Sequence, residues 1–581
     1  MLGFGKKNED AEDKDAEASD DSQMGDEEQD RLLKQFRRQL DSAEKHAKEI
    51  NAEKDRAHKV YLGESHRLYG KQRDYKNPRD WRSRRFPKII KEHVELKVAE
   101  LCDSPPEFDV VARFPEFEEV ASATEKAVAH YLDMDEWPRK HRISMRSAVK
   151  YGSQPVKIVM MFDPYLDKVR PTIIPLAYED FLPQPGQPDI SKMSYCFHRW
   201  KGTINDLRAV KDDDGEPFYS NLDDLLEGGS GDSDAQQRPD ETSEAFEARR
   251  TGLHTIHERW TPHGMVAVAN KSVIIRVDEN ADDPIFEDKQ VPFEVVRIVE
   301  SEVNLDGSSV VLDAEEGQSG YWKFYNELVD AVTMATRPPK LVDEELDQNA
   351  AKYDIYPDAK IPTRGGESSV KIMQDVASLT GYNMQSLIQM ERDHVERQTG
   401  MNSTVAGIAN SGSATQSSNN LSQAKSRTRL EVTVSDDDWG RVVRKYHCRI
   451  MQYCDDEDVL RAAGGVDIKV PEAKGLLAFR AKVASSRVLR EQRQNSLTTL
   501  WNAIMPMIQP GTVEFEQVDK LLKELVSAYD VIDIAPVAKS QQQAQLDQAE
   551  TQLQIDGQSM QQQMELQQQM APPPAEGQAP A

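Results

Sequence analysis

Apolar residues at alternating spacings of three and four predict several amphipathic helices along this chain. The first stripe comprises Leu33, Phe36, Leu40, Ala43, Ala47 and Ile50. Such a stripe can pack on its own domain or pair between chains as a coiled coil, and we favour packing on its own domain. Further helices are expected over residues 84–101, 120–132, 142–150, 321–336, 382–397 and 421–453. Pro105 and Pro106 end the first of these, and Gly152 follows the third as a C-cap.

The hydrophobic period changes to two in the middle of the chain, which predicts strands. The expected strands are 156–162, 172–176, 195–200, 255–260, 265–269 and 273–277. Asn270 and Lys271 form the turn between the last two. Residues 211–252 are rich in Asp, Gly, Ser and Gln and predict a flexible insertion without a core. The fold class is therefore α+β and predominantly helical, with a further helical stretch over residues 472–534.

Charge and composition mark the two ends of the chain as unlike the rest. Residues 9–30 hold twelve acids and one base, so residues 1–30 are expected to be a disordered acidic arm. Residues 541–570 hold fourteen glutamines, which predicts a disordered Gln-rich tail over 536–581. The sevenfold spacing of Leu546, Leu553 and Met560 favours a helical barrel instead, although Gly557 interrupts it.

The net charge of −28 excludes a protein that grips the phosphate backbone through a large basic surface. A negative wall would instead weakly repel a DNA duplex and hold it near the axis of a channel. Four cysteines without a CxxC pair indicate a reducing compartment. The first residues, MLGFGKKNEDAED, have no apolar stretch, and no later run is long enough for a membrane span, so neither a signal peptide nor a membrane partner is expected.

Catalytic motifs give no support for an enzyme. The chain has no GxxxxGK[ST] phosphate loop, and residues 317–320 fall one residue short of a GxSxG elbow. Two SxxK matches, at Ser368 and Ser422, are attributed to chance in a Ser-rich chain. We therefore expect no catalytic residues and no cofactor.

One group of histidines requires consideration as a metal site: His254, His257 and His263, with Glu258 beside them. Strand alternation would turn His254 and His257 to opposite faces of a sheet. Solvated or hydrogen-bonded histidines are therefore expected, and no metal.

The order of elements resembles the portal proteins of tailed phages. The segments that carry the resemblance are RRFPKIIKEHVELKVAELCDSPPEFDV (84–110), SMRSAVKYGSQPVKIVMMFDPYLDKVRPTIIPLAYEDFLPQP (144–185), DISKMSYCFHRWKGTINDL (189–207) and the helix-rich region 321–453. In that family the subunit has wing, stem, clip and crown, and it assembles as a dodecameric ring around a channel. Neither the insertion 211–252 nor the acidic arm has a counterpart in the family.

The resemblance implies a division of the chain into parts. They are a wing domain (31–320), a stem helix (321–336), a clip (337–375), a second stem helix (376–398), a tunnel loop (399–420), a long helix with the wing return (421–471) and a crown (472–535).

Site residues follow from these parts. The tunnel loop would present short neutral side chains to DNA: Asn402, Ser403, Thr404, Asn410, Ser411, Ser413 and Thr415. A disordered surface loop is the alternative. Lys425, Arg427 and Arg429 would contact phosphates or serve surface solubility. The clip would dock partners through Arg337, Lys340, Lys360 and Arg364.

The function implied by the resemblance is a portal at one capsid vertex, which packages and ejects the viral genome. Its partners would be its own copies, the large subunit of the terminase, head-completion adaptor and tail proteins, major capsid and scaffold proteins, and double-stranded DNA that passes without sequence specificity. It would lie in the virion, and in the host cytoplasm during assembly. The alternatives are a coiled-coil virion scaffold or adaptor without a channel, and a nuclease or protease for which no ligand set or triad is found.

Overall fold

The structure, a computed structural model, divides the chain into two units, Met1–Arg487 and Val488–Ala581. It describes residues 26–64, 80–102, 106–163, 166, 168–210, 217–226, 243–343, 356–363, 371–372, 380–401, 414–469, 475–481, 498–499 and 502. The architecture below is that of the first unit. The predictions for the Gln-rich tail, for residues 1–25 of the acidic arm and for most of the crown lie outside the described residues.

An antiparallel five-stranded sheet in the order β4-β5-β6-β7-β8 forms one half of the core. Its strands are β4 (Phe181–Pro183), β5 (Cys196–Gly202), β6 (His254–Thr261), β7 (Gly264–Ala269) and β8 (Val273–Glu279). The predicted turn at Asn270 and Lys271 is confirmed, and both residues have positive φ, of 51° and 58°. Trp260 and Met265 are fully buried on one face of this sheet, together with Phe293 of the neighbouring sheet.

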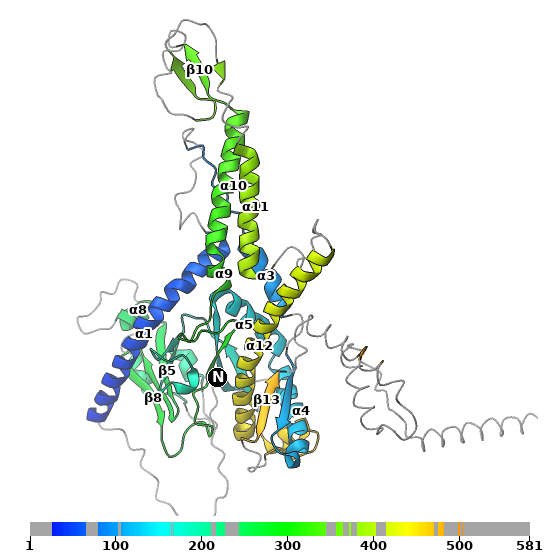
Figure 1. Ribbon diagram of the computed structural model, residues 1–581. Coiled ribbons are helices and arrows are strands. Elements are labelled where there is room, and N and C mark those ends of the chain that lie inside the picture. Colours follow the sequence, from blue (N-terminus) through cyan, green and yellow to red (C-terminus); the bar gives the residue numbers. More distant parts are fainter. Residues whose placement is uncertain are drawn as a thin grey trace, which may run out of the picture. The chain divides into compact units, whose positions relative to one another are not determined.

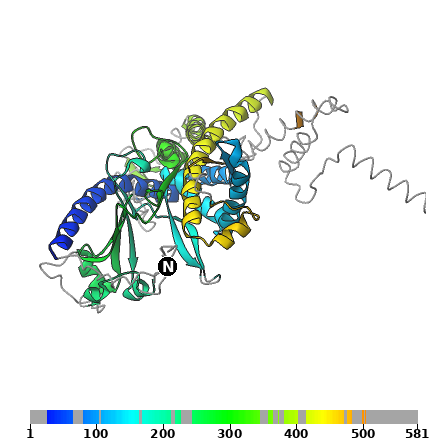
Figure 2. The same ribbon diagram turned by 90° about the horizontal axis from the view of Figure 1, so that it is seen from below.

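The second sheet has the order β3-β2-β9, with β2 (Ser153–Asp163), β3 (Lys168–Pro175) and β9 (Phe293–Arg297). The long helix α12 (Ala414–Tyr453) packs against all three strands. Arg297 binds Asp438 of α12 through two guanidinium nitrogens, at 3.1 and 3.0 Å. Figures 1 and 2 show α12, in yellow, beside the cyan strands, while the five-stranded sheet is green.

The first apolar stripe lies on helix α1 (Asp26–Leu62), which packs on the other face of the five-stranded sheet. Phe36, Leu40, Ala43 and Ala47 pack there against a set of sheet residues. These are Leu182, Phe197, Val266 and Val268. The stripe therefore packs within its own domain and is not a free coiled-coil seam. Residues 26–30, predicted to belong to the disordered arm, are the first turn of this helix.

Shorter helices complete this unit around the second sheet: α3 (Ile89–Leu101), α4 (Glu118–Met134), α5 (Trp137–Tyr151), α9 (Val310–Asp313) and α13 (Asp456–Ala462). The ring centroids of Trp137 on α5 and Trp439 on α12 lie 4.7 Å apart, edge to face. Gly152 follows α5 with a φ of 85°, which confirms the predicted C-cap. None of the helices in the described part of the chain is both long and apolar enough to cross a lipid bilayer.

Three expectations from the sequence are corrected here. Helix α3 begins at Ile89, not at residue 84, because Pro87 disfavours helical backbone at Phe86. Residues 477–481, predicted as helix, form strand β13 (Leu477–Ala481), which pairs antiparallel with β1 (Phe108–Ala112).

The third correction concerns the insertion 211–252, which contributes to the core in its described parts. Phe218, Tyr219, Leu222 and Leu225 are buried in the main hydrophobic cluster. They lie on or just before the short helix α7 (Leu222–Leu226), and α8 (Ser243–Thr251) packs on β6. Another short helix, α6 (Ile204–Arg208), precedes the insertion. A few large apolar residues between acidic runs are enough to fill this site, although the average composition hides them.

The remaining elements form a helix pair with a small sheet at its end. Helices α10 (Glu315–Thr336) and α11 (Thr380–Thr399) run side by side away from the two larger sheets (Figure 1). Between them in sequence, β10 (Lys340–Asp343), β11 (Lys360–Thr363) and β12 (Lys371–Ile372) form a three-stranded sheet, called the tip sheet below.

Candidate functional site

The junction where α11 ends and α12 begins is the part of the chain predicted to carry the tunnel loop. Residues 402–413 lie outside the described residues, and with them Asn402, Ser403, Thr404, Asn410, Ser411 and Ser413. Thr415 lies in the first turn of α12, which begins at Ala414, so the interhelical segment is shorter than predicted. What the structure describes is how the α11 end of this segment is held.

The end at α11 is held by one group of side chains, here called the anchor cluster: His93, Lys97, Thr399, Arg427 and Glu431. They come from α3, the last residue of α11 and the first half of α12.

A buried ion pair lies at the centre of the anchor cluster. Lys97 Nζ lies 2.7 Å from Glu431 Oε1 and donates a further bond of 2.8 Å to the carbonyl of Thr399. Both charged side chains are only 3% exposed. Burial lowers the pKa of Lys97, while the Glu431 charge opposes this shift. Removing one partner of such a pair costs about 3–5 kcal/mol, because the other charge stays buried and unpaired.

His93 fixes the end of α11 through Thr399. The Thr399 hydroxyl donates to the carbonyl of Val395 at 2.9 Å, and His93 Nδ1 lies 2.9 Å from the same hydroxyl oxygen. Donation from His93 Nδ1 leaves the single proton of the hydroxyl for the Val395 carbonyl. Burial lowers the pKa of His93, so the neutral imidazole is the form that makes this contact.

Arg427, one of the predicted phosphate contacts, belongs to the anchor cluster. Its Nε donates to Glu431 at 3.2 Å and its Nη1 to the carbonyl of Arg397 at 3.1 Å. Gly400 has a φ of 75°, and a Cβ there would come within 3.1 Å of the Arg427 side chain. Arg429 is exposed on α12, and Lys425 lies on α12 with its side chain outside the described residues. The three predicted residues therefore lie on one helix, and only Arg427 is placed in these intrachain bonds.

The helix pair is closely packed where it joins the larger sheets. A Cβ at Gly317 of α10 would lie 2.8 Å from Cγ2 of Val395, so the two helices need glycine there to approach this closely. The extended segment 80–88 runs along α10. Ser83 N donates to Asp330 at 2.6 Å, and Trp322 Nε1 donates to the carbonyl of Pro87 at 2.7 Å.

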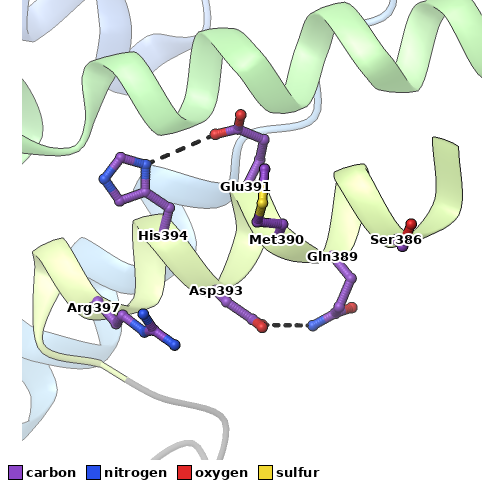
Figure 3. A pocket seen from close by; sticks show the side chains of 7 residues that line it. All are labelled: Ser386, Gln389, Met390, Glu391, Asp393, His394 and Arg397. Carbon is purple, nitrogen blue, oxygen red and sulfur yellow. Dashed lines mark hydrogen bonds and ion pairs between the residues drawn. The ribbon is translucent and has the colours of Figure 1, made fainter. Parts of the chain in front are cut away.

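Helix α11 also has an open face with a hollow. Figure 3 shows the residues that line it: Ser386, Gln389, Met390, Glu391, Asp393, His394 and Arg397. Gln389 Nε2 donates to Asp393 at 2.7 Å, and His394 Nδ1 lies 3.8 Å from Glu391. Met390 is 55% exposed, and so is Val332 of α10. The residues in the hollow other than Glu391 are called the outer face of α11 below.

The tip sheet carries the residues predicted to dock partners. Arg337 and Lys340 are exposed, and Lys340 pairs with Lys360 across the parallel β10–β11 register. The Lys360 side chain and all of Arg364 lie outside the described residues.

Sequence reasoning missed His93, Lys97 and Glu431. A signal was present, because His93 and Lys97 lie on the apolar face of α3 with Ile90, Val94 and Val98. A cation on such a stripe indicates a buried partner, but the sequence does not say which acid supplies it.

Comparison with known protein families gives one finding. The family model described as phage SU10 portal protein matches residues 115–571, well over half of the chain. None of the curated proteins searched matches the chain.

Proposed function

The chain belongs to the phage SU10 portal protein family, and on this premise we propose that its copies close into a ring around a channel for viral DNA at one capsid vertex. A dodecamer, as in the wider portal family, is the proposed copy number. The role is structural: the ring guides DNA during packaging and ejection, and motor work is left to the terminase.

The observation that carries this proposal is the helix pair with the tip sheet between its helices, followed directly by the α11–α12 junction. In this reading α10 and α11 are the stem, the tip sheet is the clip, and residues 402–413 are the core of the tunnel loop. The anchor cluster supports that assignment at one end of the loop, because Lys97, held by its buried ion pair with Glu431, binds the last residue of α11. A loop beside a moving duplex needs a fixed attachment if its tip is to keep its position in the channel.

Ring closure requires two different and complementary surfaces on each subunit, because head-to-tail contacts join unlike patches. The outer face of α11 is a candidate for one of them. It exposes Met390 among groups of both charges, Asp393 and Arg397. Apolar side chains rimmed by polar groups are common in association surfaces.

The chemistry of DNA passage follows from the charge of the chain. With a net charge of −28 per subunit, a ring of this protein would repel a duplex weakly and bind no particular sequence. Asn402, Ser403, Thr404, Asn410, Ser411, Ser413 and Thr415 are proposed to touch DNA through short-lived hydrogen bonds, with Lys425 and Arg429 as candidates for phosphate contacts.

The clip would dock the large terminase subunit during packaging and head-completion adaptor and tail proteins afterwards. Arg337, Lys340, Lys360 and Arg364 are proposed for these contacts. Major capsid and scaffold proteins would surround the ring at the vertex of the virion, after assembly in the host cytoplasm.

Negative-stain images of the purified full-length protein test the proposal. Rings with a central hole are expected, and rods or small open oligomers would favour the scaffold alternative. The structure argues against the scaffold alternative, because its main motif, the stripe on α1, is buried against the protein's own sheet. Phe36 and Leu40 of this stripe are fully buried there.

A further inference from the structure

A second group of polar side chains lies where α1 and α8 cover one face of the five-stranded sheet. Glu44 comes from α1, Glu244 from the first turn of α8, and His257 from β6 beneath them. One ligand atom from each of the three lies within 4.8 Å of the others. Lys271, in the β7–β8 turn, completes the group.

His257 is the unusual member, because it is fully buried and neither of its ring nitrogens has a hydrogen-bond partner. Its Nε2 lies 3.8 Å from Glu44 Oε1 and its Nδ1 3.6 Å from Glu244 Oε2, which is too long for hydrogen bonds. Oε2 of Glu244 is also buried without a hydrogen-bond partner. The expectation of a solvated or hydrogen-bonded histidine is therefore wrong for His257, whereas His254 Nδ1 lies 2.9 Å from Nδ2 of Asn270.

A buried polar atom without a hydrogen-bond partner costs free energy, and a bound ion or ligand at the site is one explanation for it. The protonation state of His257 suits a cation, whereas burial raises the pKa of Glu244, and a bound cation would have to keep that carboxyl group ionised. Burial, with the charges of Lys271 and Arg199, lowers the pKa of His257 to about 3, so its imidazole is neutral at pH 7. A neutral imidazole nitrogen is the form that binds a metal.

We propose that Glu44, Glu244 and His257 form a binding site for a divalent transition-metal ion such as Zn²⁺. One imidazole nitrogen and two carboxylate oxygens suit zinc, while Mg²⁺ and Ca²⁺ prefer oxygen ligands alone. Zinc bonds of about 2.0–2.2 Å place tetrahedral ligand atoms roughly 3.3 Å apart. The two carboxylates lie beside different ring nitrogens of His257, at 3.8 Å from Nε2 and 3.6 Å from Nδ1, and a metal would bind only one of these nitrogens. One ligand atom from each residue lies within 4.8 Å of the others, so the side chains would have to rotate and close around the ion. Water would take the fourth position.

Lys271 is the competitor of the metal. Its Nζ lies 2.7 Å from Glu44 and 3.4 Å from Glu244, so it neutralises the carboxylates that the metal would use. The Lys271 side chain is 22% exposed, which lets the ammonium group turn toward water when a metal enters. If the cluster is a metal site, removing the Lys271 charge should tighten metal binding. If the cluster is only a set of ion pairs, the same change would leave Glu44 and Glu244 unpaired, and no metal would bind.

A metal at this site would hold α1 and α8 on the five-stranded sheet. A metal held by α1, α8 and β6 joins segments that are distant in sequence, and it stabilises the folded state because the unfolded chain cannot assemble the site. This inference does not depend on ring formation.

The test uses the purified full-length protein, stripped with EDTA and then dialysed against ZnCl₂, with bound zinc measured by elemental analysis and the melting temperature by circular dichroism. The wild type is expected to retain about one zinc per chain and to melt at a higher temperature with zinc than without it. His257→Gln and Glu44→Gln should each weaken binding by at least about tenfold, and Lys271→Met should strengthen it. His263→Gln is the matched control, because His263 is exposed in the β6–β7 turn and should bind as the wild type does.

Two results would overturn the inference. One is equal zinc retention by the wild type and by both His257→Gln and Glu44→Gln, which would place the metal on other residues. The other is no retention by either the wild type or Lys271→Met. If His257→Gln fails to fold by circular dichroism, Glu44→Gln decides, because Glu44 is partly exposed on α1.

Discussion

The anchor cluster and the outer face of α11 are supplied in part by the same helix, yet they are built in opposite ways. At Thr399 the helix ends among buried charges that are paired within the chain. About two and a half turns earlier, Met390 is 55% exposed and lines the open hollow. One end of the helix is thus fixed inside the subunit, and its side is left open to other molecules.

One helix can thus contribute both to the stability of the subunit and to its assembly. A buried ion pair adds little net stability over an apolar contact, but it fails if either partner is lost, and so it holds one geometry. An exposed apolar side chain costs little in the single subunit and becomes useful only when a second surface covers it. Stability measurements should therefore respond to the anchor cluster, and assembly measurements to the outer face.

The largest effect is expected from Glu431→Leu, which leaves Lys97 buried without its counter-charge. We expect a loss of about 3–5 kcal/mol in the free energy of unfolding. Urea denaturation of the full-length protein, followed by circular dichroism, measures it. The matched control is Glu457→Leu, which breaks the surface pair of Glu457 and Arg461, both over 70% exposed, and should change stability by less than about 0.5 kcal/mol.

The double variant Lys97→Met/Glu431→Leu sharpens this test. Replacing both charges by apolar groups should restore most of the lost stability. Equal free energies of unfolding for Glu431→Leu and Glu457→Leu would mean that the Lys97–Glu431 pair does not contribute to the stability of the fold.

The next largest effect concerns acid, which should loosen the part of the protein that holds α12. His141 of α5 is buried against Trp137 and Trp439, and burial lowers its pKa from 6.5 to about 3. Between these two values the unfolded chain binds the proton and the folded chain does not. Stability from this group is therefore present above pH 6.5 and falls by about 1.4 kcal/mol for each pH unit below it.

Between pH 6.5 and pH 5, the free energy of unfolding of His141→Phe should fall by about 2 kcal/mol less than that of the wild type. Urea denaturation at a series of pH values gives the slope. Val303→Ala, a change of an exposed side chain that carries no titratable group, should leave the slope as in the wild type. A slope unchanged by His141→Phe would show that His141 is protonated in the folded state.

A smaller effect is expected inside the helix pair. Gly317→Ala places a methyl group against the short, stiff side chain of Val395, and we expect a loss of about 1–3 kcal/mol in spite of the better helix propensity of alanine. Gly320→Ala is the matched control. Its new methyl group meets only the flexible carboxylate end of Glu391, which can move aside, so stability should stay level or rise slightly. Melting temperatures compare the two, and an equal loss in both would contradict the close approach at Gly317.

The sequence predicted the seven longest helices and six of the thirteen strands in the described part of the chain, because each of these is marked by its own hydrophobic period. It failed where a distant segment decides the local structure. Residues 84–88 are not helical, because Pro87 disfavours helix before it and because Ser83 and Arg85 bind Asp330 and Asn326 of α10 through their backbone N–H groups. Likewise β13 forms because β1 pairs with it, and no local period shows such a partner.

The candidate site was less predictable than the fold. The loop predicted between α11 and α12 lies mostly outside the described residues, and the charges that hold the end of α11 come from segments that meet only in the folded chain. Arg427 illustrates the limit, because its sequence position suggests a phosphate contact while Glu431, one turn later, binds its Nε. The family membership rests on the match over residues 115–571, and the individual DNA-contacting and docking residues remain predictions.

The smallest effect on stability, and the clearest on assembly, is expected at the outer face of α11. Met390→Lys places a charge at an exposed position, so the free energy of unfolding should change by less than about 0.5 kcal/mol. Ring formation should fall sharply, because a charge replaces the apolar centre of the proposed subunit contact. Size-exclusion chromatography and negative-stain images measure the ring fraction. Val303→Lys adds the same charge at a residue that is 78% exposed in a loop, and it should leave ring formation unchanged. Rings as abundant in Met390→Lys as in Val303→Lys would mean that the subunits meet elsewhere, and the contrast between a fixed end and an open face on α11 would then have no role in assembly.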